Sequence, residues 1–181
     1  MKKIIALNTA SASALLVLFS TSTLFAQSTP TLTDPEIASV AVIANQSDID
    51  FARIAQRKST NAEVLKFAET MARDHQAVID QAVALVTKLH VTPKANAVGK
   101  KMAADAANNG KMLAAKSKAS FDKAYIDNEV AYHKAVIAAV ETILIPQADN
   151  AELKALLQNV VPALKAHLQH AEMLQRSVAS K

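Results

Sequence analysis

Four residues that could bind a metal ion interrupt apolar stripes of predicted helices. They are Asp48, His75, His133 and His167. Each stands in a run of apolar residues spaced alternately three and four positions apart, so that the whole run lies on one helical face directed at a core. Imidazole and carboxylate groups bind iron, zinc, copper or manganese, and buried charges need such compensation. The pattern indicates a divalent metal site inside a helical protein.

Glu129 is a fifth candidate ligand, because it precedes His133 by four residues and shares its helical face. Asp74 adjoins His75, where it either orients that ring or faces water. A second interpretation stays open: histidines hydrogen-bonded to the two carboxylates, Tyr125 or Tyr132 would give specificity to a uniform Ala/Val/Leu core without any metal. The candidate metal ligands are therefore Asp48, His75, Glu129, His133 and His167.

The stripes predict four long helices, with capping signals at their starts. The helices run from Asp34 to the break at residues 59–61, from Thr60 to His90, from about Ser120 to about Pro146, and from Asp149 toward the C-terminus. The buried stripe of the last helix is expected to pass through Leu153, Leu156, Val160 and Leu164. Pro162 is expected to kink that helix or to loosen one of its turns. Four such helices predict an all-α, antiparallel four-helix bundle.

Residues 91–119 form a longer connection in this prediction, with one or two short helices interrupted at Asn108–Gly110. The turns near residues 59 and 147 are then expected at the same end of the bundle. At a rise of about 1.5 Å per residue, His75 and His133 come out level. Asp48 and His167 come out about one turn above and below them.

Composition narrows the function further. The 181 residues are 51% hydrophobic and include two glycines and no cysteine, which excludes thiolate metal sites and cysteine nucleophiles. The net charge of +4 includes Lys2 and Lys3, and basic residues are interspersed with acidic ones. No Gly-rich phosphate loop or aromatic and basic platform is present, so no nucleic-acid partner is expected. No catalytic residue, reaction or protein partner is predicted.

The N-terminus has the layout of a secretory signal peptide. Met1-Lys2-Lys3 supplies positive charge, residues 10–19 an apolar run, and Leu24-Phe25-Ala26 a cleavage site. The apolar run is shorter than the roughly 20 residues of a spanning helix. We therefore expect residues 1–26 to be a cleaved signal peptide, 27–33 a flexible lead-in and 34–181 the bundle. The mature protein is then periplasmic or secreted, without a transmembrane segment.

Three motifs resemble a known family. They are Lys58–Ala68 continuing through Met71 to Asp74-His75, Phe121-Asp122 with Tyr125 and His133, and Pro162–Leu168 containing His167. Together with Asp48 they resemble the exported bacterial proteins catalogued as domain of unknown function 4142. The resemblance implies a ferritin-like fold and brings no established reaction. In that comparison Asp48 stands where the family usually has Glu, which shortens the reach of the side chain.

The sequence departs from the di-iron pattern of ferritin-like bundles, which uses two Glu-x-x-His motifs. Ala72, Val130 and Leu164 precede the three histidines by three positions. Two hypotheses result. The first is an exported helical bundle that binds a metal ion through inward His and carboxylate side chains. The second is a structural or interaction module of the cell envelope with no bound metal.

Overall fold

The computed structural model describes residues 30–179, and the predicted signal peptide, residues 1–26, lies outside them. The described chain is helical throughout, which confirms the predicted all-α class. Its elements are α1 (Asp34–Lys58), α2 (Ala62–Lys88), α3 (Ala97–Ala115), α4 (Lys118–Ala139), the π-helical turn η1 (Val140–Leu144), α5 (Ile145–Gln147) and α6 (Ala151–Ala179). Among these helices, none combines the length and the apolar character needed to cross a membrane.

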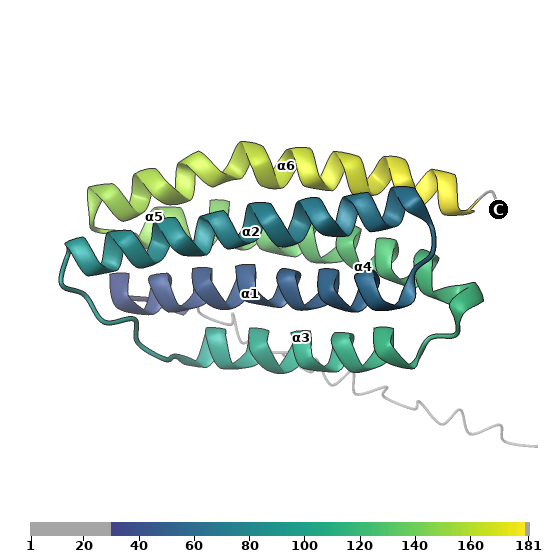
Figure 1. The fold of residues 1–181 in the computed structure, drawn as a ribbon. Helices are drawn as coiled ribbons and strands as arrows, with labels where there is room; N and C mark the ends of the chain where they lie inside the picture. The colour runs from purple at the N-terminus through teal and green to yellow at the C-terminus, as the bar shows by residue number, and fades with distance from the viewer. Residues whose placement is uncertain (1–29, 180–181) are drawn as a thin grey trace, which may run out of the picture.

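Four long helices, α1, α2, α4 and α6, surround the core (Figure 1). The α1 helix packs mainly on α2, and α4 mainly on α6, while contacts of α2 with α6 and of α1 with α4 close the bundle. In Figure 1 the chain runs left to right in α1 and α6 and right to left in α2 and α4. Neighbouring helices of the bundle are therefore antiparallel, as predicted.

The connection between the two halves differs from the prediction. In place of short helices interrupted at Asn108–Gly110, α3 is one helix of 19 residues that packs along the outside of α1. Its Asn96 cap accepts a hydrogen bond from the Gly99 amide at 2.8 Å. A Cβ at Gly99 would lie 2.9 Å from Ile43 Cδ1, so glycine lets α3 approach α1 closely. Gly110 lies inside the helix, where glycine costs about 1 kcal/mol relative to alanine, and α3 remains one helix there while it packs on α1.

This crossover helix changes which turns share an end of the bundle. Because α3 carries the chain back along α1, the turn at residues 59–61 and the turn at residues 148–150 lie at opposite ends (Figure 1). The expectation that both lie at one end was wrong. The α1 start is fastened to the second turn instead, since Asp34 accepts hydrogen bonds from the amides of Asp149 and Asn150, both at 2.9 Å.

Local capping sets the helix starts within a residue or two of the predicted ones. Thr33 and Glu36 form a capping box at α1. Asn61, rather than Thr60, caps α2 by accepting from the Glu63 amide at 3.0 Å, and Asn150 caps α6. These short polar side chains satisfy amides that lack helical partners. The helix α6 continues through Pro162, which is exposed.

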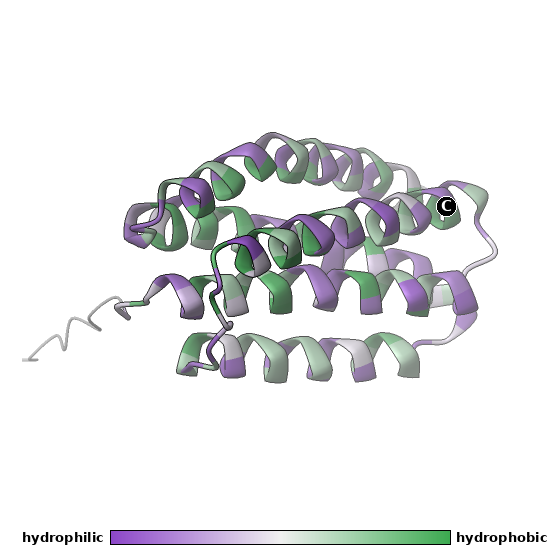
Figure 2. Cartoon of the chain, turned by 60° about the vertical axis from the view of Figure 1, so that its left-hand side comes forward, coloured by the Kyte–Doolittle hydropathy of each residue, from purple (hydrophilic) through white to green (hydrophobic). Residues whose placement is uncertain are grey.

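Apolar faces of the helices turn toward one another (Figure 2) and form two core clusters. One cluster is built around Phe51, Phe67 and Tyr125, and the other around Ile37, Leu144 and Leu157. The buried stripe of α6 passes through Leu157, which is 3% exposed, whereas Leu156 is only half-buried. Leu156 was therefore misplaced in the predicted stripe by one position.

Candidate metal centre

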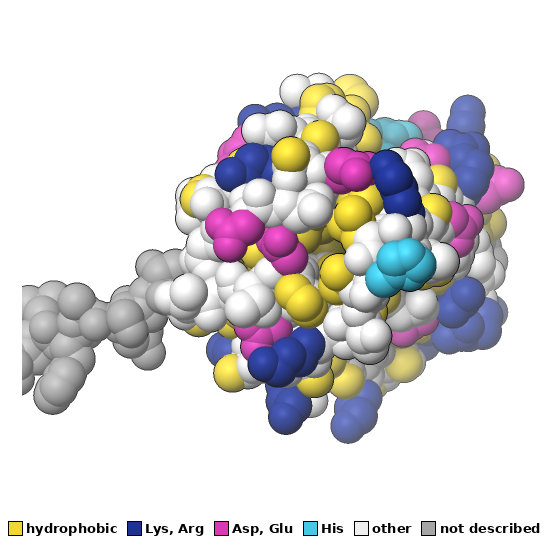
Figure 3. Space-filling view, turned by 90° about the vertical axis from the view of Figure 1, so that its left-hand side faces the viewer, with side chains coloured by type: hydrophobic (Ala, Val, Ile, Leu, Met, Phe, Trp, Pro, Cys, Tyr) yellow, Lys and Arg dark blue, Asp and Glu magenta, His cyan; other side chains and the backbone are white. Residues whose placement is uncertain are grey.

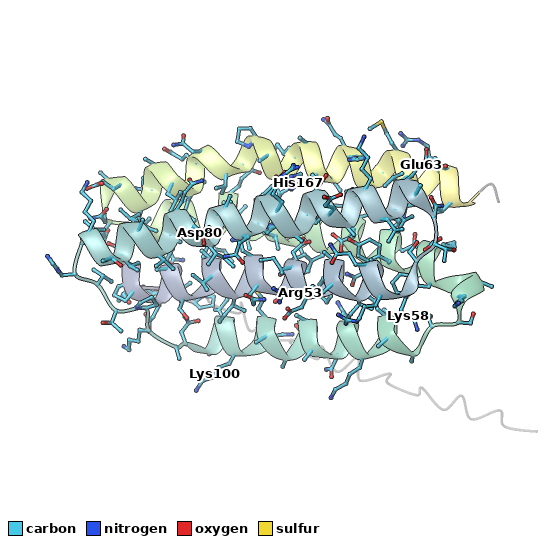
Figure 4. The ribbon with its side chains drawn as sticks, in the orientation of Figure 1. Arg53, Lys58, Glu63, Asp80, Lys100 and His167 are labelled. Atoms are coloured by element: carbon cyan, nitrogen blue, oxygen red, sulfur yellow. The ribbon has the colours of Figure 1, made fainter. Side chains whose placement is uncertain are left out.

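The five predicted ligand residues come together where the two apolar clusters meet. The α1 helix supplies Asp48, α2 supplies His75, α4 supplies Glu129 and His133, and α6 supplies His167. All five side chains are buried. Figure 4 labels His167 midway along α6, beside α2. A polar cluster from all four bundle helices therefore occupies an otherwise apolar core.

Asp48, His75, His133 and His167 lie at similar heights along the bundle axis once the helix ends that share an end of the bundle are assigned correctly. Measured from the end that holds the α1 start, Asp48 lies 14 residues from Asp34, His75 lies 13 from Lys88 and His167 lies 16 from Ala151. His133 lies 14 residues from Gln147, counted through η1 and α5, which follow α4 directly. At about 1.5 Å per residue these positions differ by less than one helical turn. The prediction that Asp48 and His167 lie a turn away from the other two was wrong, because it depended on the end assignment that α3 reverses.

Asp48 lies nearest to two of the histidines. Its Oδ2 is 3.4 Å from His75 Nε2 and 3.6 Å from His133 Nε2. The three imidazole rings lie in mutual contact, with centroids 5.3 to 5.7 Å apart. Ligand atoms of His75, His133 and His167 all lie within 4.8 Å of one another, and so do those of Asp48, Glu129 and His133.

Each histidine is held through one ring nitrogen, which leaves the other nitrogen directed at the cluster. His75 Nδ1 lies 2.7 Å from Asn45 Oδ1, His133 Nδ1 lies 3.0 Å from the Glu129 carbonyl oxygen, and His167 Nε2 lies 3.1 Å from Asp74 Oδ2. These three acceptors require N–H at the nitrogens that face them. The lone pairs then sit on His75 Nε2, His133 Nε2 and His167 Nδ1, none of which has a hydrogen-bond partner in the described protein.

Metal-binding histidines in proteins are oriented in this way, by a carbonyl or carboxylate on the second ring nitrogen. The spacing also fits. Four ligand atoms bound tetrahedrally at about 2.0–2.1 Å from zinc lie about 3.3–3.5 Å from one another. The separations of Asp48 Oδ2 from the two nearest imidazole nitrogens are 3.4 and 3.6 Å. The donor set, its orientation and the two separations at Asp48 are therefore compatible with a small divalent ion, and the other ligand atoms lie within 4.8 Å of one another in their two groups.

The two carboxyl groups of the site are buried where ionisation is unfavourable. Burial raises the pKa of Asp48 to about 8. Burial, together with the nearby charge of Asp48, raises the pKa of Glu129 well above its usual range. In the described part of the chain no Lys or Arg pairs with either group, and their polar neighbours are each other, Tyr125 and the histidines. A bound cation would supply the missing positive charge.

The pKa values of the three histidines are shifted in the opposite direction, downward. Burial, reinforced by the neighbouring imidazoles, lowers the pKa of His75 to about 3. Burial also lowers the pKa of His133 to about 4 and lowers that of His167. These rings are thus neutral at pH 7, which is the form that binds metals.

Of the residues that orient the histidine rings, one was not predicted from the sequence and another has a different partner from the one considered. Asn45 precedes Asp48 by three residues and so lies on the same face of α1, but Asn is too common on helices for that spacing to be a signal. Asp74 orients His167 on α6 and not its neighbour His75, because adjacent residues on a helix point in different directions. The Tyr132 hydroxyl donates its hydrogen bond to the backbone carbonyl of Ala44, at 2.8 Å, and not to a histidine.

The fold and the cluster define a class: an antiparallel helical bundle whose core contains buried His and carboxylate side chains with the spacing of a candidate metal site. Residues 20–174 match the family described as Domain of unknown function (DUF4142), and the chain belongs to that family. No curated protein matches the chain. A solved structure of CopM in the Cu(II)-bound form is similar, with a TM-score of 0.61 over 82% of this chain and 99% of that one. The two are 17% identical, so the likeness establishes a shared fold.

Proposed function

We propose that this protein is exported and binds a divalent transition-metal ion through His75, His133 and His167, with carboxylate oxygen from Asp48 and Glu129. One observation carries the proposal. Ligand nitrogens of His75, His133 and His167 lie within 4.8 Å of one another, and each ring has one buried nitrogen without a hydrogen-bond partner and a second nitrogen held by a separate acceptor. A cluster that served packing alone would leave these atoms buried and unsatisfied, at about 1–3 kcal/mol each.

Copper and zinc suit this donor set best. Imidazole favours zinc, copper, iron and nickel, whereas an oxygen-only site would favour magnesium, calcium or manganese. Divalent affinities rise along the series from manganese through iron to copper and fall again at zinc. The Cu(II)-bound CopM shares the fold, which makes copper the first ion to test. We expect Cu²⁺ to bind more tightly than Zn²⁺, and Zn²⁺ more tightly than Mn²⁺.

The chain's own residues prepare the site for binding. The packed helices place the five side chains before any ion arrives, so little conformational entropy is lost on binding. Asn45, Asp74 and the Glu129 carbonyl fix the tautomers. The carboxyl groups of Asp48 and Glu129 release their protons as a cation binds. A bound ion would supply charge neutralisation of the core, and the role that follows is metal binding or storage in the envelope.

Elemental analysis of protein purified without an affinity tag from a periplasmic extract tests the proposal. We expect close to one equivalent of copper or zinc. Adding Cu²⁺ or Zn²⁺ to metal-free protein, at about 100 times the dissociation constant, should raise the free energy of unfolding by roughly 2.7 kcal/mol. Absence of both metal and stabilisation would favour the alternative, a structural or interaction module of the cell envelope whose histidines only shape the core.

Export is tested separately by mass spectrometry of the secreted or periplasmic protein. A mature chain that begins at Gln27 is expected, because the charged start, apolar run and Ala26 follow the signal-peptide layout. Intact Met1 on protein in the membrane fraction would contradict export with cleavage and would leave the metal site unaffected.

A further inference from the structure

A cavity of about 80 Å³ lies inside the bundle beside the histidine cluster. Its inner end is polar and is lined by the site residues Asp48, His75, His133 and His167, with Asn45, Asp74 and Tyr132. From there it follows the helices toward the end where α1 and α6 begin. Ala38 is ten residues from Asp48 along α1 and also lines the cavity, so the lined region is about 15 Å long.

Beyond the polar end every lining residue is Ala, Val, Leu or Met. Leu144, Leu153 and Leu157 come from the second half of the chain, and Val40 and Ala82 from the first. Buried water needs about three hydrogen bonds, and cavities walled by aliphatic side chains stay dry. The apolar part of this cavity offers no such partners, so it suits an apolar occupant.

The cavity runs toward a hollow at one end of the molecule. Figure 3 looks onto that end and shows hydrophobic side chains gathered in a recess at its centre, with charged side chains around them. The turn η1 lies beside the route, since Val140 and Leu144 both line the cavity. A small molecule entering at this end would meet apolar walls until it reached the histidines.

The size limits the occupant. An engineered apolar cavity of about 150 Å³ binds benzene or xenon, and the volume here is about half of that. We propose that the cavity takes up apolar molecules of the size of dioxygen and holds them next to the histidine cluster. This inference goes beyond metal binding, because the cavity and its walls are present in the protein without an ion.

NMR spectra of the metal-free protein, recorded with xenon or with dissolved dioxygen, test the proposal. Methyl resonances of Leu157, which lines the cavity, are compared with those of Leu113, which is equally buried and does not line it. We expect dioxygen to enhance relaxation of the Leu157 methyl protons several-fold more than that of Leu113, and xenon to shift Leu157 selectively. Equal effects at the two leucines would overturn the proposal.

Two matched substitutions on α2 provide the control. Ala82 and Ala68 are both buried, but only Ala82 lines the cavity. Ala82→Leu fills free space, so it should leave Tm unchanged or raised and should reduce the gas effects at Leu157 to those at Leu113. Ala68→Leu overpacks a filled core, so it should lower Tm by at least about 2 °C while the gas effects persist.

Gas effects at Leu157 that survive Ala82→Leu, or an equal loss of Tm in the two variants, would show that no usable space exists at this position. Displacement of xenon by decanoate would assign the cavity to alkyl chains instead and overturn the size limit. None of these measurements uses a metal ion, so failure of the metal assignment would leave their outcome readable.

Discussion

Asp74 on α2 holds the ring of His167 on α6, with 3.1 Å between its Oδ2 and His167 Nε2. Asp74 is partly exposed and also contacts the Arg73 guanidinium. Although burial opposes ionisation, hydrogen bonds from His167 and Arg73 lower the pKa of Asp74. A charged carboxylate at the rim of the bundle thus fixes the tautomer and orientation of a buried imidazole.

Removing this carboxylate should weaken metal binding without removing a ligand. We expect Asp74→Ala to lower the affinity for Cu²⁺ or Zn²⁺ by 10- to 100-fold, as loss of an orienting group does at other metal sites. Asp80→Ala is the control, because Asp80 lies on the same helix, is exposed and bonds only to Gln76 in the described structure. Calorimetric titration measures both. Equal affinities in the two variants would show that Asp74 does not act on the site.

Periodicity could identify the residues of this cluster but not how they meet. Asp48, His75, His133 and His167 each stand in a helical apolar stripe, and that pattern is independent of topology. Their levels depend on which helix ends coincide, and α3 decides this. Its sequence carries Asn108-Asn109-Gly110, which reads as a break because local propensity opposes helix there. Packing against α1 overrides that preference, and no local signal reveals it.

In α6 the sequence pattern likewise cannot decide which of two adjacent leucines is buried. The spacing of three and four allows a stripe through either Leu156 or Leu157, and the choice depends on how α6 faces α4. Leu157→Ala should therefore lower the free energy of unfolding by about 2–5 kcal/mol, since Leu157 is 3% exposed. Leu156→Ala should cost clearly less. Urea unfolding compares the two, and a larger loss for Leu156→Ala would show that the face of α6 is wrong.

Substitution of the ligands separates metal binding from a structural role of the histidines. His75→Gln and His133→Gln should each remove most of the stabilisation by added Cu²⁺ or Zn²⁺, because each deletes one of three converging imidazoles. His90→Gln should retain it, since His90 is exposed and lies just after α2. Thermal unfolding with and without the ion is the measurement.

Equal metal-induced stabilisation of the wild type and the His75/His133 double variant would place the metal elsewhere. The metal-free variants add a second readout. If the histidines only shape the core, the same substitutions should destabilise the protein by breaking buried hydrogen bonds while the wild type shows no response to metal.

The buried carboxyl group of Asp48 makes the stability of the metal-free protein fall as the pH rises from about 4 to about 8. Its pKa is about 8 in the folded protein and about 3.9 when unfolded. Its contribution is therefore complete below about pH 4 and is lost as pH rises through 8. His75 and His133, with folded pKa values of about 3 and 4, act oppositely, but their contribution is complete above the unfolded value of about 6.5.

Between pH 6.5 and 7.5 the carboxyl groups thus determine how the free energy of unfolding changes with pH. We expect the free energy of unfolding to fall by about 1 kcal/mol or more across this unit, since one proton per molecule corresponds to about 1.4 kcal/mol. Asp48→Asn should flatten the slope, and Glu69→Gln, at an exposed position on α2, should not. Zn²⁺ should reverse its sign, because ligands must lose protons to bind. A metal-free wild type whose stability stays constant over this range would contradict a protonated Asp48 in the core.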